Sequence, residues 1–130
     1  MAVNRKVLIV DDDKNILMSL QMVLEDEGYE VLVASSAKEA LEILKTGDNP
    51  KVMYFDLHMP EMDGVELCEI VRKTHQLALI YAMTGYTSIY NTASCRQAGF
   101  DDMFIKPFSI AQFREVTRDS FKKIDRWFET

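Results

Sequence analysis

The chain has 130 residues, of which 48% are hydrophobic and 28% charged, a balance typical of a single globular domain and unlike that of a disordered chain. Its 15 basic and 21 acidic residues give a net charge of −6, which argues against the basic surface that nucleic-acid binding normally requires. No apolar run is long enough to cross a membrane, and two cysteines, Cys68 and Cys95, are too few for a disulfide framework. We therefore expect one cytoplasmic domain in which both cysteines are packing residues.

Five short apolar runs, rich in β-branched and aromatic residues, are spread along the chain. Because each run is apolar throughout, without alternating polar residues, it is typical of a strand that is covered on both faces of a sheet. The runs comprise residues 7–10, 31–33, 52–55, 77–81 and 103–105.

A helical pattern of apolar residues follows each of these runs. Asp13 precedes the first pattern and can cap a helix there. Ser36 with Glu39 forms a capping box before the second pattern, and Ser109 with Gln112 does the same before the fifth. The patterns cover residues 16–24, 37–44, 65–71, 88–98 and 110–124.

The alternation of strand and helix, repeated five times, predicts an α/β fold. We expect a single doubly wound (βα)5 sandwich, with one five-stranded parallel sheet and helices on both of its faces. Ligands of such sheets bind at the carboxyl ends of the strands. Functional residues are therefore expected just after Val10, Phe55, Met83 and Ile105.

Three adjacent carboxylates, Asp11, Asp12 and Asp13, follow the first predicted strand. They repel one another unless a cation lies among them, and a hard divalent ion such as Mg²⁺ prefers oxygen ligands of this kind. The alternative is a solvated turn without a metal, in which Asp13 only caps the next helix.

A single carboxylate, Asp56, ends the third predicted strand, which is otherwise apolar. Burying a carboxylate there is costly unless the site uses it. Asp56 can act as a metal ligand, as a nucleophile toward phosphorus, or as both. The alternative is a carboxylate that only shapes the following turn.

A hydroxyl and a cation follow the last two strands. Thr84, with Gly85 behind it, can donate to an anionic oxygen, and Lys106 can neutralise charge arriving at Asp56. Each residue alone is a weak signal. Together with the carboxylates they predict a site that holds Mg²⁺ and a phosphoryl group.

The ordered set of these segments resembles the receiver domain of the response regulators in two-component signalling. The resemblance extends from about residue 6 to residue 121 and implies the doubly wound fold described above. The segments that carry it are Val-Asp-Asp-Asp at 10–13, Asp-Leu-His-Met-Pro-Glu-Met-Asp-Gly at 56–64, Thr-Gly at 84–85, Ala-Gly-Phe-Asp-Asp at 98–102 and Lys-Pro-Phe at 106–108.

The resemblance implies a Mg²⁺ site, with Mn²⁺ as an alternative ion. Asp12 matches the residue that binds the metal directly, and Asp11 matches its partner, which often acts through water. Asp56 matches the phosphoacceptor aspartate, which is also a ligand. The backbone carbonyl of His58 matches the third ligand from the protein.

The resemblance also implies phosphoryl transfer to Asp56 from a sensor histidine kinase or a phosphotransfer protein. Thr84 and Lys106 match the hydroxyl and the amine that contact the phosphoryl group, and the Lys106–Pro107 bond is expected to be cis. Such a domain is a signalling module and is not counted as an enzyme. An alternative is a receiver-like interaction scaffold that works without phosphorylation.

Three positions depart from the family pattern: Met103, and also His58 and Tyr86, which match positions that tune dephosphorylation in the family. Met103 lies where an aromatic residue usually couples the threonine to the output surface, and the neighbouring Phe104 is expected to face the opposite side of the sheet. Met103 is either a softer switch residue together with Thr84, or the coupling takes a different route. Tyr86, two residues after Thr84, is expected to shield the phosphoryl group and slow its hydrolysis.

Two other classes of protein fit the residues less well. A haloacid-dehalogenase-like phosphohydrolase has a second aspartate two residues after its nucleophile, where this chain has His58. A flavodoxin-like flavin carrier needs a phosphate-binding loop after the first strand, where three aspartates would repel phosphate.

The C-terminal residues leave two readings open. We expect a receiver domain over residues 1–121 and a helical extension over residues 122–130, which either ends a stand-alone receiver or begins a linker to an output domain. Homodimerisation through this helix is an alternative, and the downstream partner is unknown. Candidates for the output surface are Tyr90, Arg96, Phe104 and Phe113.

Overall fold

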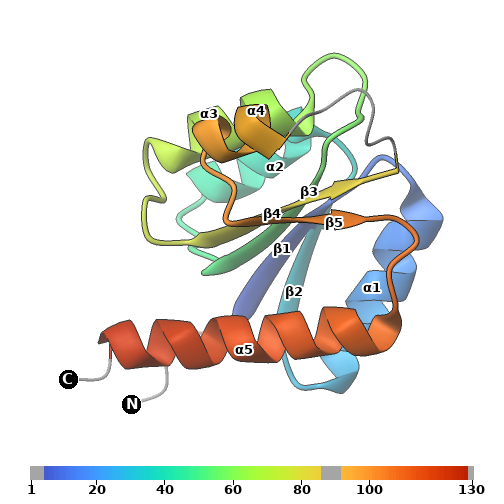
Figure 1. The fold of residues 1–130 in the computed structure, drawn as a ribbon, viewed down its shortest axis with the longest axis vertical. Helices are drawn as coiled ribbons and strands as arrows, with labels where there is room; N and C mark the ends of the chain where they lie inside the picture. The colour runs from blue at the N-terminus through green and yellow to red at the C-terminus, as the bar shows by residue number, and fades with distance from the viewer. Residues whose placement is uncertain (1–4, 86–91, 129–130) are drawn as a thin grey trace.

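The computed structural model describes residues 5–85 and 92–128, and within them five strands alternate with five helices (Figure 1). The elements are β1 (Lys6–Val10), α1 (Lys14–Asp26), β2 (Glu30–Ala34), α2 (Ala37–Lys45), β3 (Val52–Asp56), α3 (Gly64–Arg72), β4 (Leu79–Thr84), α4 (Thr92–Ala98), β5 (Asp102–Ile105) and α5 (Ile110–Phe128).

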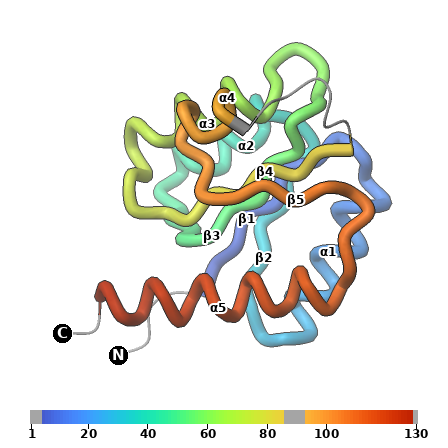
Figure 2. The backbone as a smooth tube through the Cα atoms, viewed as in Figure 1, coloured from blue at the N-terminus to red at the C-terminus, as the bar shows by residue number. Residues whose placement is uncertain are grey.

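The strands form one parallel sheet in the order β2-β1-β3-β4-β5, which confirms the predicted doubly wound fold. Helices α2, α3 and α4 cover one face, and α1 and α5 cover the other (Figures 1 and 2). The strand order reverses direction between β1 and β3, the position at which doubly wound sheets bind ligands.

The core consists of two apolar layers, one on each face of the sheet, to which successive strand residues contribute in turn. Met53 and Phe55 point into the layer beneath α2–α4, whereas Val52 and Tyr54 point into the layer beneath α1 and α5. All five residues of β3 are buried, as its continuous apolarity predicts. Each large side chain buried in this way contributes roughly 1.5–3 kcal/mol.

Both cysteines belong to the first of these layers, as expected for packing residues. Burial raises the pKa of the Cys68 thiol to about 12 and also raises that of Cys95. Both side chains therefore remain protonated at neutral pH.

Side-chain caps fix the beginnings of the helices as predicted. Asp13 accepts hydrogen bonds from the amides of Asn15, at 2.9 Å, and Ile16, at 3.3 Å. A cap of this kind contributes about 1 kcal/mol and fixes where the chain leaves the strand end. The other predicted caps are Ser36 on the Glu39 amide, at 3.1 Å, and Ser109 on the Gln112 amide, at 2.9 Å.

The fourth strand lies later in the chain than the apolar run predicts. Pairing with β3 begins at Leu79, whose amide donates to the Lys51 carbonyl, and it continues to Thr84. Leu77 lies two residues before Leu79, the first residue of β4 that pairs with β3, and is 70% exposed. The prediction that residues 77 and 78 lie in the strand is therefore wrong. Of the helix predicted over residues 88–98, positions 88–91 lie outside the described residues.

Helix α5 continues without interruption through residue 121 to Phe128. Two hydroxyl pairs tie its buried face to the sheet: Tyr54 with Thr117 at 2.6 Å, and Tyr81 with Ser120. The division of the chain at residue 121 stays a prediction. No described helix has the length and apolarity needed to span a lipid bilayer.

The structure removes two of the four candidates for the output surface. Phe104 and Phe113 are 9% and 2% exposed, because both belong to the apolar layer between the sheet and helices α1 and α5. These two candidates were therefore wrong. Arg96 on α4 is exposed, and Tyr90 lies outside the described residues.

Candidate functional site

The ends of four neighbouring strands bring the predicted residues to one edge of the sheet. Asp11 follows β1, Asp56 ends β3, Thr84 ends β4 and Lys106 follows β5. Asp56 lies opposite Met83, so Thr84 is one residue further along the adjacent strand. The predicted juxtaposition therefore follows from parallel pairing in this register.

Three carboxylates form a compact cluster at this edge. Asp11, Asp12 and Asp56 each offer an oxygen, and these atoms lie within 4.8 Å of one another. Asp11 and Asp56 are buried and Asp12 is exposed. Hard carboxylate oxygens at this spacing fit Mg²⁺, with the exposed side leaving room for water ligands.

Backbone amides hold the two buried carboxylates in place. The Asp13 amide donates to Asp11 Oδ1 at 2.9 Å, and the His58 amide donates to Asp56 Oδ1 at 3.3 Å. The His58 side chain is exposed, and the contact of this residue with Asp56 described above is made by its backbone amide. The role of its carbonyl as a metal ligand stays a prediction.

Lys106 supplies a positive charge to the cluster, and most of its interaction is with Asp11. Its Nζ lies 2.6 Å from Asp11 Oδ2 and 3.4 Å from Asp56 Oδ1. Burial alone would lower the pKa of Lys106, but the hydrogen bond and charge of Asp11, with those of Asp56, raise it overall. The Lys106 amide donates to the Thr84 carbonyl at 2.8 Å, and the Lys106–Pro107 bond is cis, as expected.

The charged groups of the chain compensate the charge of Asp56 only in part. Burial, and next the charge of Asp11, raise the pKa of Asp56 to about 7, although Lys106 acts in the opposite direction. Three carboxylates and one ammonium group carry a net charge of two negative units when all are ionised. A divalent cation would balance that charge.

Replacing Asp56 with asparagine is expected to stabilise the metal-free fold above neutral pH. Below the ordinary carboxyl pKa of 3.8, Asp56 binds a proton in both the folded and the unfolded chain. Between 3.8 and about 7 only the folded chain holds that proton, so the free energy of unfolding falls as pH rises through this window. Solvent screens part of the effect, which leaves an expected gain of about 2 kcal/mol for the variant.

Urea unfolding across this pH range, with a chelator present, measures the difference. Asp26→Asn on the exposed end of α1 is the matched control and should show no such pH dependence. If the stability of Asp56→Asn exceeded that of the unmodified chain by the same amount at acidic and alkaline pH, burial of the charge would not be the cause.

The predicted switch residues, Thr84 and Met103, lie on the same face of the sheet, because Met103 pairs with Ala82 and Thr84 is two residues further along β4. Thr84 is fully buried at the end of β4. Met103 on β5 is half-buried against the layer beneath α2–α4, and Phe104 belongs to the opposite layer, as predicted from the strand geometry. Tyr86, the residue expected to shield the phosphoryl group, lies outside the described residues.

The sequence did not predict the close packing of Gly64 against the end of β3. Gly64 begins α3 directly against the end of β3, and its amide donates to the Leu57 carbonyl at 3.2 Å. A Cβ atom at this position would lie 2.3 Å from the Asp56 carbonyl oxygen. The sequence signal for it is the Asp63-Gly64 pair, which predicts only a turn and a helix start.

The model of the response regulator receiver domain family matches residues 7–118, which is most of the chain. The chain is 35% identical over 106 residues to the alkaline phosphatase synthesis transcriptional regulatory protein PhoP of Bacillus subtilis, covering 82% of this chain and 44% of that protein. It is also 35% identical over 107 residues to the response regulator MprA of Mycobacterium ulcerans, covering 82% of this chain and 46% of that protein. The chain thus spans about half the length of these curated relatives.

Solved structures show the same similarity. A CheY-like response regulator receiver domain protein from Methanospirillum hungatei has a TM-score of 0.89 and 32% identity, covering 95% of this chain and 98% of that chain. The receiver domain of the Francisella response regulator 1452 has a TM-score of 0.83 and 33% identity, covering 93% and 99%. The chain therefore belongs to the response regulator receiver domains of two-component signalling systems.

Proposed function

We propose that this receiver domain accepts a phosphoryl group onto Asp56 in a Mg²⁺-dependent reaction. The observation that carries the proposal is the buried Asp56 carboxylate, which lies within 4.8 Å of two further carboxylates. The Lys106 ammonium group contacts it at 3.4 Å but lies closer to Asp11, at 2.6 Å. Family membership supports the same reading.

The side chains of Asp11, Asp12 and Asp56, with the backbone carbonyl of His58, are the groups that would hold Mg²⁺ or Mn²⁺. When bound, the metal would supply positive charge beside the oxygens of a transferring phosphoryl group. Two backbone amides already fix the two buried carboxylates, which pre-organises the cluster for a cation.

In the proposed reaction an Asp56 carboxylate oxygen attacks phosphorus in line. A new oxygen–phosphorus bond forms as the bond from phosphorus to the donor histidine nitrogen breaks, and the electron pair leaves with that nitrogen. Lys106 neutralises charge on the phosphoryl oxygens, and the Thr84 hydroxyl donates to one of them. Water later cleaves the aspartyl phosphate and restores Asp56.

Met103 is the residue we assign to the conformational response, together with Thr84. It lines a hollow of about 420 Å³ between α4 and β5, shared with Cys95 and Phe100. An unbranched side chain beside such a space can change rotamer without displacing the strand. Phe104 is held between the rings of Tyr81 and Phe108, at centroid distances of 5.6 and 6.0 Å, and has less freedom to respond.

Receiver domains act with histidine kinases or phosphotransfer proteins, and we assign this chain a partner of one of those two classes. Because two of its curated relatives are named as transcriptional regulators and are about twice as long as this chain, an output domain or a separate downstream protein is the proposed target of the switch. A phosphorylation-independent scaffold is the second reading, but the intact carboxylate cluster favours the phosphoacceptor.

Intact-mass measurement after incubation with Mg²⁺ and acetyl phosphate tests the proposal. We expect one added phosphoryl group, absent from Asp56→Asn and from a sample with chelator, and still present in the matched control Asp26→Asn. If neither acetyl phosphate nor a phosphorylated histidine kinase adds a phosphoryl group to the unmodified chain, the scaffold reading replaces the proposal.

A further inference from the structure

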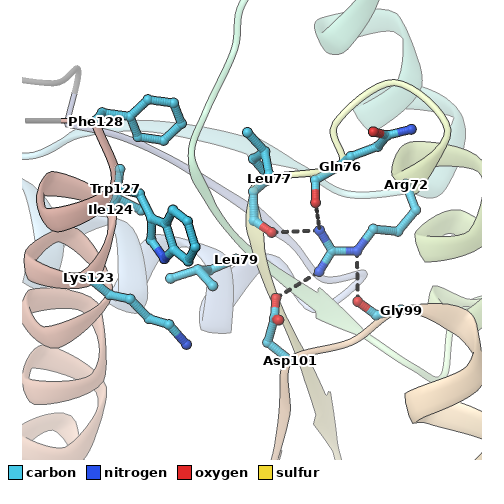
Figure 3. Close-up of a pocket in the computed structure, with 11 residues that line it drawn as sticks. Arg72, Gln76, Leu77, Leu79, Gly99, Asp101, Lys123, Ile124, Trp127 and Phe128 are labelled. Atoms are coloured by element: carbon cyan, nitrogen blue, oxygen red, sulfur yellow. Dashed lines mark hydrogen bonds and ion pairs between the residues drawn. The ribbon is translucent and has the colours of Figure 1, made fainter. Parts of the chain in front are cut away.

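A groove with an apolar rim lies between the end of α5 and the beginning of β4 (Figure 3). It has a volume of about 380 Å³, within the range of binding pockets for small ligands and single side chains. Leu79, the first residue of β4, lines it, whereas Thr84 at the other end of the strand lies at the sheet edge that holds the carboxylate cluster. The groove is therefore a separate surface at the opposite edge of the sheet.

The Arg72 side chain forms a rigid, electrically neutral wall of the groove. Its guanidinium donates to the carbonyls of Gly99, at 2.7 Å, and Ala78, at 2.6 Å, and it pairs with Asp101 at 2.7 Å (Figure 3). The Asp101 carboxylate also accepts from the Ile80 amide at 2.8 Å. These bonds join the end of α3 to the beginnings of β4 and β5, so the wall does not depend on a ligand to be ordered.

Three large apolar side chains at the rim of the groove are exposed to solvent. Trp127 is 76% exposed, Leu77 is 70% exposed and Phe128 is 44% exposed. Figure 3 shows the Trp127 ring extending from α5 toward Leu79. An exposed tryptophan beside a concave surface is the arrangement that protein interfaces use at their most energetic contacts.

The same end of α5 carries an excess of positive charge. Among the residues that the structure describes, no carboxylate lies within ion-pair distance of Lys122, Lys123 or Arg126. Asp125, between them, is engaged with Arg5 at 2.8 Å. This local excess contrasts with the net charge of −6 of the whole chain.

We propose that this groove, which we name the α5–β4 groove, is a docking site for an acidic amphipathic segment of a partner protein. An apolar side chain of the partner would fill the space between Trp127 and Leu77, and its carboxylates would meet Lys123, whose side chain lines the groove. The concave shape and the ordered Arg72 wall favour an inserted side chain over a flat lipid surface. Docking here does not require phosphorylation of Asp56.

Trp127 is the only tryptophan in the chain, so its fluorescence reports on the groove directly. The probe is a synthetic helical peptide with Leu and Phe on one face and Glu on the other. We expect its addition to shift the Trp127 emission to shorter wavelength, in a saturable manner. A matched peptide with Lys in place of every Glu is expected to bind at least roughly fivefold more weakly.

Two charge-reversal variants make the test specific to the groove. Lys123→Glu is expected to weaken binding of the Glu peptide by roughly tenfold, since an attraction becomes a repulsion. Lys122→Glu changes the net charge equally, but its side chain does not line the groove, so its effect is expected to be no more than about twofold. Both residues are exposed, and phosphorylation of Asp56 by acetyl phosphate should be unchanged in both variants.

Three results would overturn the proposal. One is the absence of any shift with the Glu peptide. The second is a shift caused by vesicles containing anionic phospholipid but by neither peptide, which would assign the surface to a membrane. The third is a shift that grows with protein concentration alone, with a dimer in sedimentation analysis, which would make a second copy the occupant. None of these bears on the phosphoacceptor assignment, which the mass measurement tests separately.

Discussion

Gly64→Ala is expected to lower the free energy of unfolding by about 3 kcal/mol, although it adds a single methyl group. The added Cβ would lie 2.3 Å from the Asp56 carbonyl oxygen and 3.0 Å from the Leu57 Cα atom. Both neighbours are backbone atoms of a buried strand end, so no side chain can move aside to relieve the clash. Either α3 shifts away from β3 or the end of β3 bends.

Urea unfolding measures this effect, and Gly85→Ala is the matched control. Among the residues that the structure describes, a Cβ at Gly85 meets no atom within 4 Å, and the backbone conformation of Gly85 is not in the left-handed region. The control should therefore retain its stability to within about 0.5 kcal/mol. Because the clash involves Asp56 itself, Gly64→Ala should also weaken Mg²⁺ binding. Equal stabilities of the two variants would show that α3 can move at no cost.

The sequence was sufficient to predict the architecture and which side chains meet at one edge of the sheet. Apolar runs and capping residues are local signals, and parallel pairing then brings the strand ends together without further information. Asp56 and Lys106 were placed at one edge by this argument alone, and the structure has them 3.4 Å apart.

Features that depend on exact packing were beyond the sequence. Leu77 is as apolar as the residues of β4, but it precedes the point at which β3 offers a partner, so it remains outside the sheet. Phe113 is on the amphipathic α5, and only the packing of α5 against the sheet shows that its side chain is buried. The sequence also predicted that Lys106 would neutralise charge at Asp56, whereas the shorter contact of Lys106 is with Asp11.

Because Lys106 lies closer to Asp11 than to Asp56, its removal is expected to change phosphoryl transfer and Mg²⁺ binding in opposite directions. Lys106→Met is expected to slow phosphoryl transfer to Asp56 from acetyl phosphate by about a hundredfold. It is also expected to tighten Mg²⁺ binding by roughly fivefold, because the ammonium group competes with the metal for the same carboxylates. Loss of Lys106 leaves Asp11, which is fully buried, without its closest cation, and this penalty further favours a bound metal.

The two opposite effects distinguish a direct role of Lys106 in transfer from a merely structural one. A variant that only distorts the site would lose metal affinity and transfer rate together, so tighter binding with slower transfer is the diagnostic result. Calorimetric titration with Mg²⁺ and a time course of intact mass at saturating Mg²⁺ supply the two measurements. Lys38→Met on the exposed surface of α2 removes the same charge far from the cluster and should change neither quantity. Weaker Mg²⁺ binding in Lys106→Met would mean that Asp11 needs its lysine in order to hold the metal, and that the ammonium group organises the carboxylates and does not compete for them.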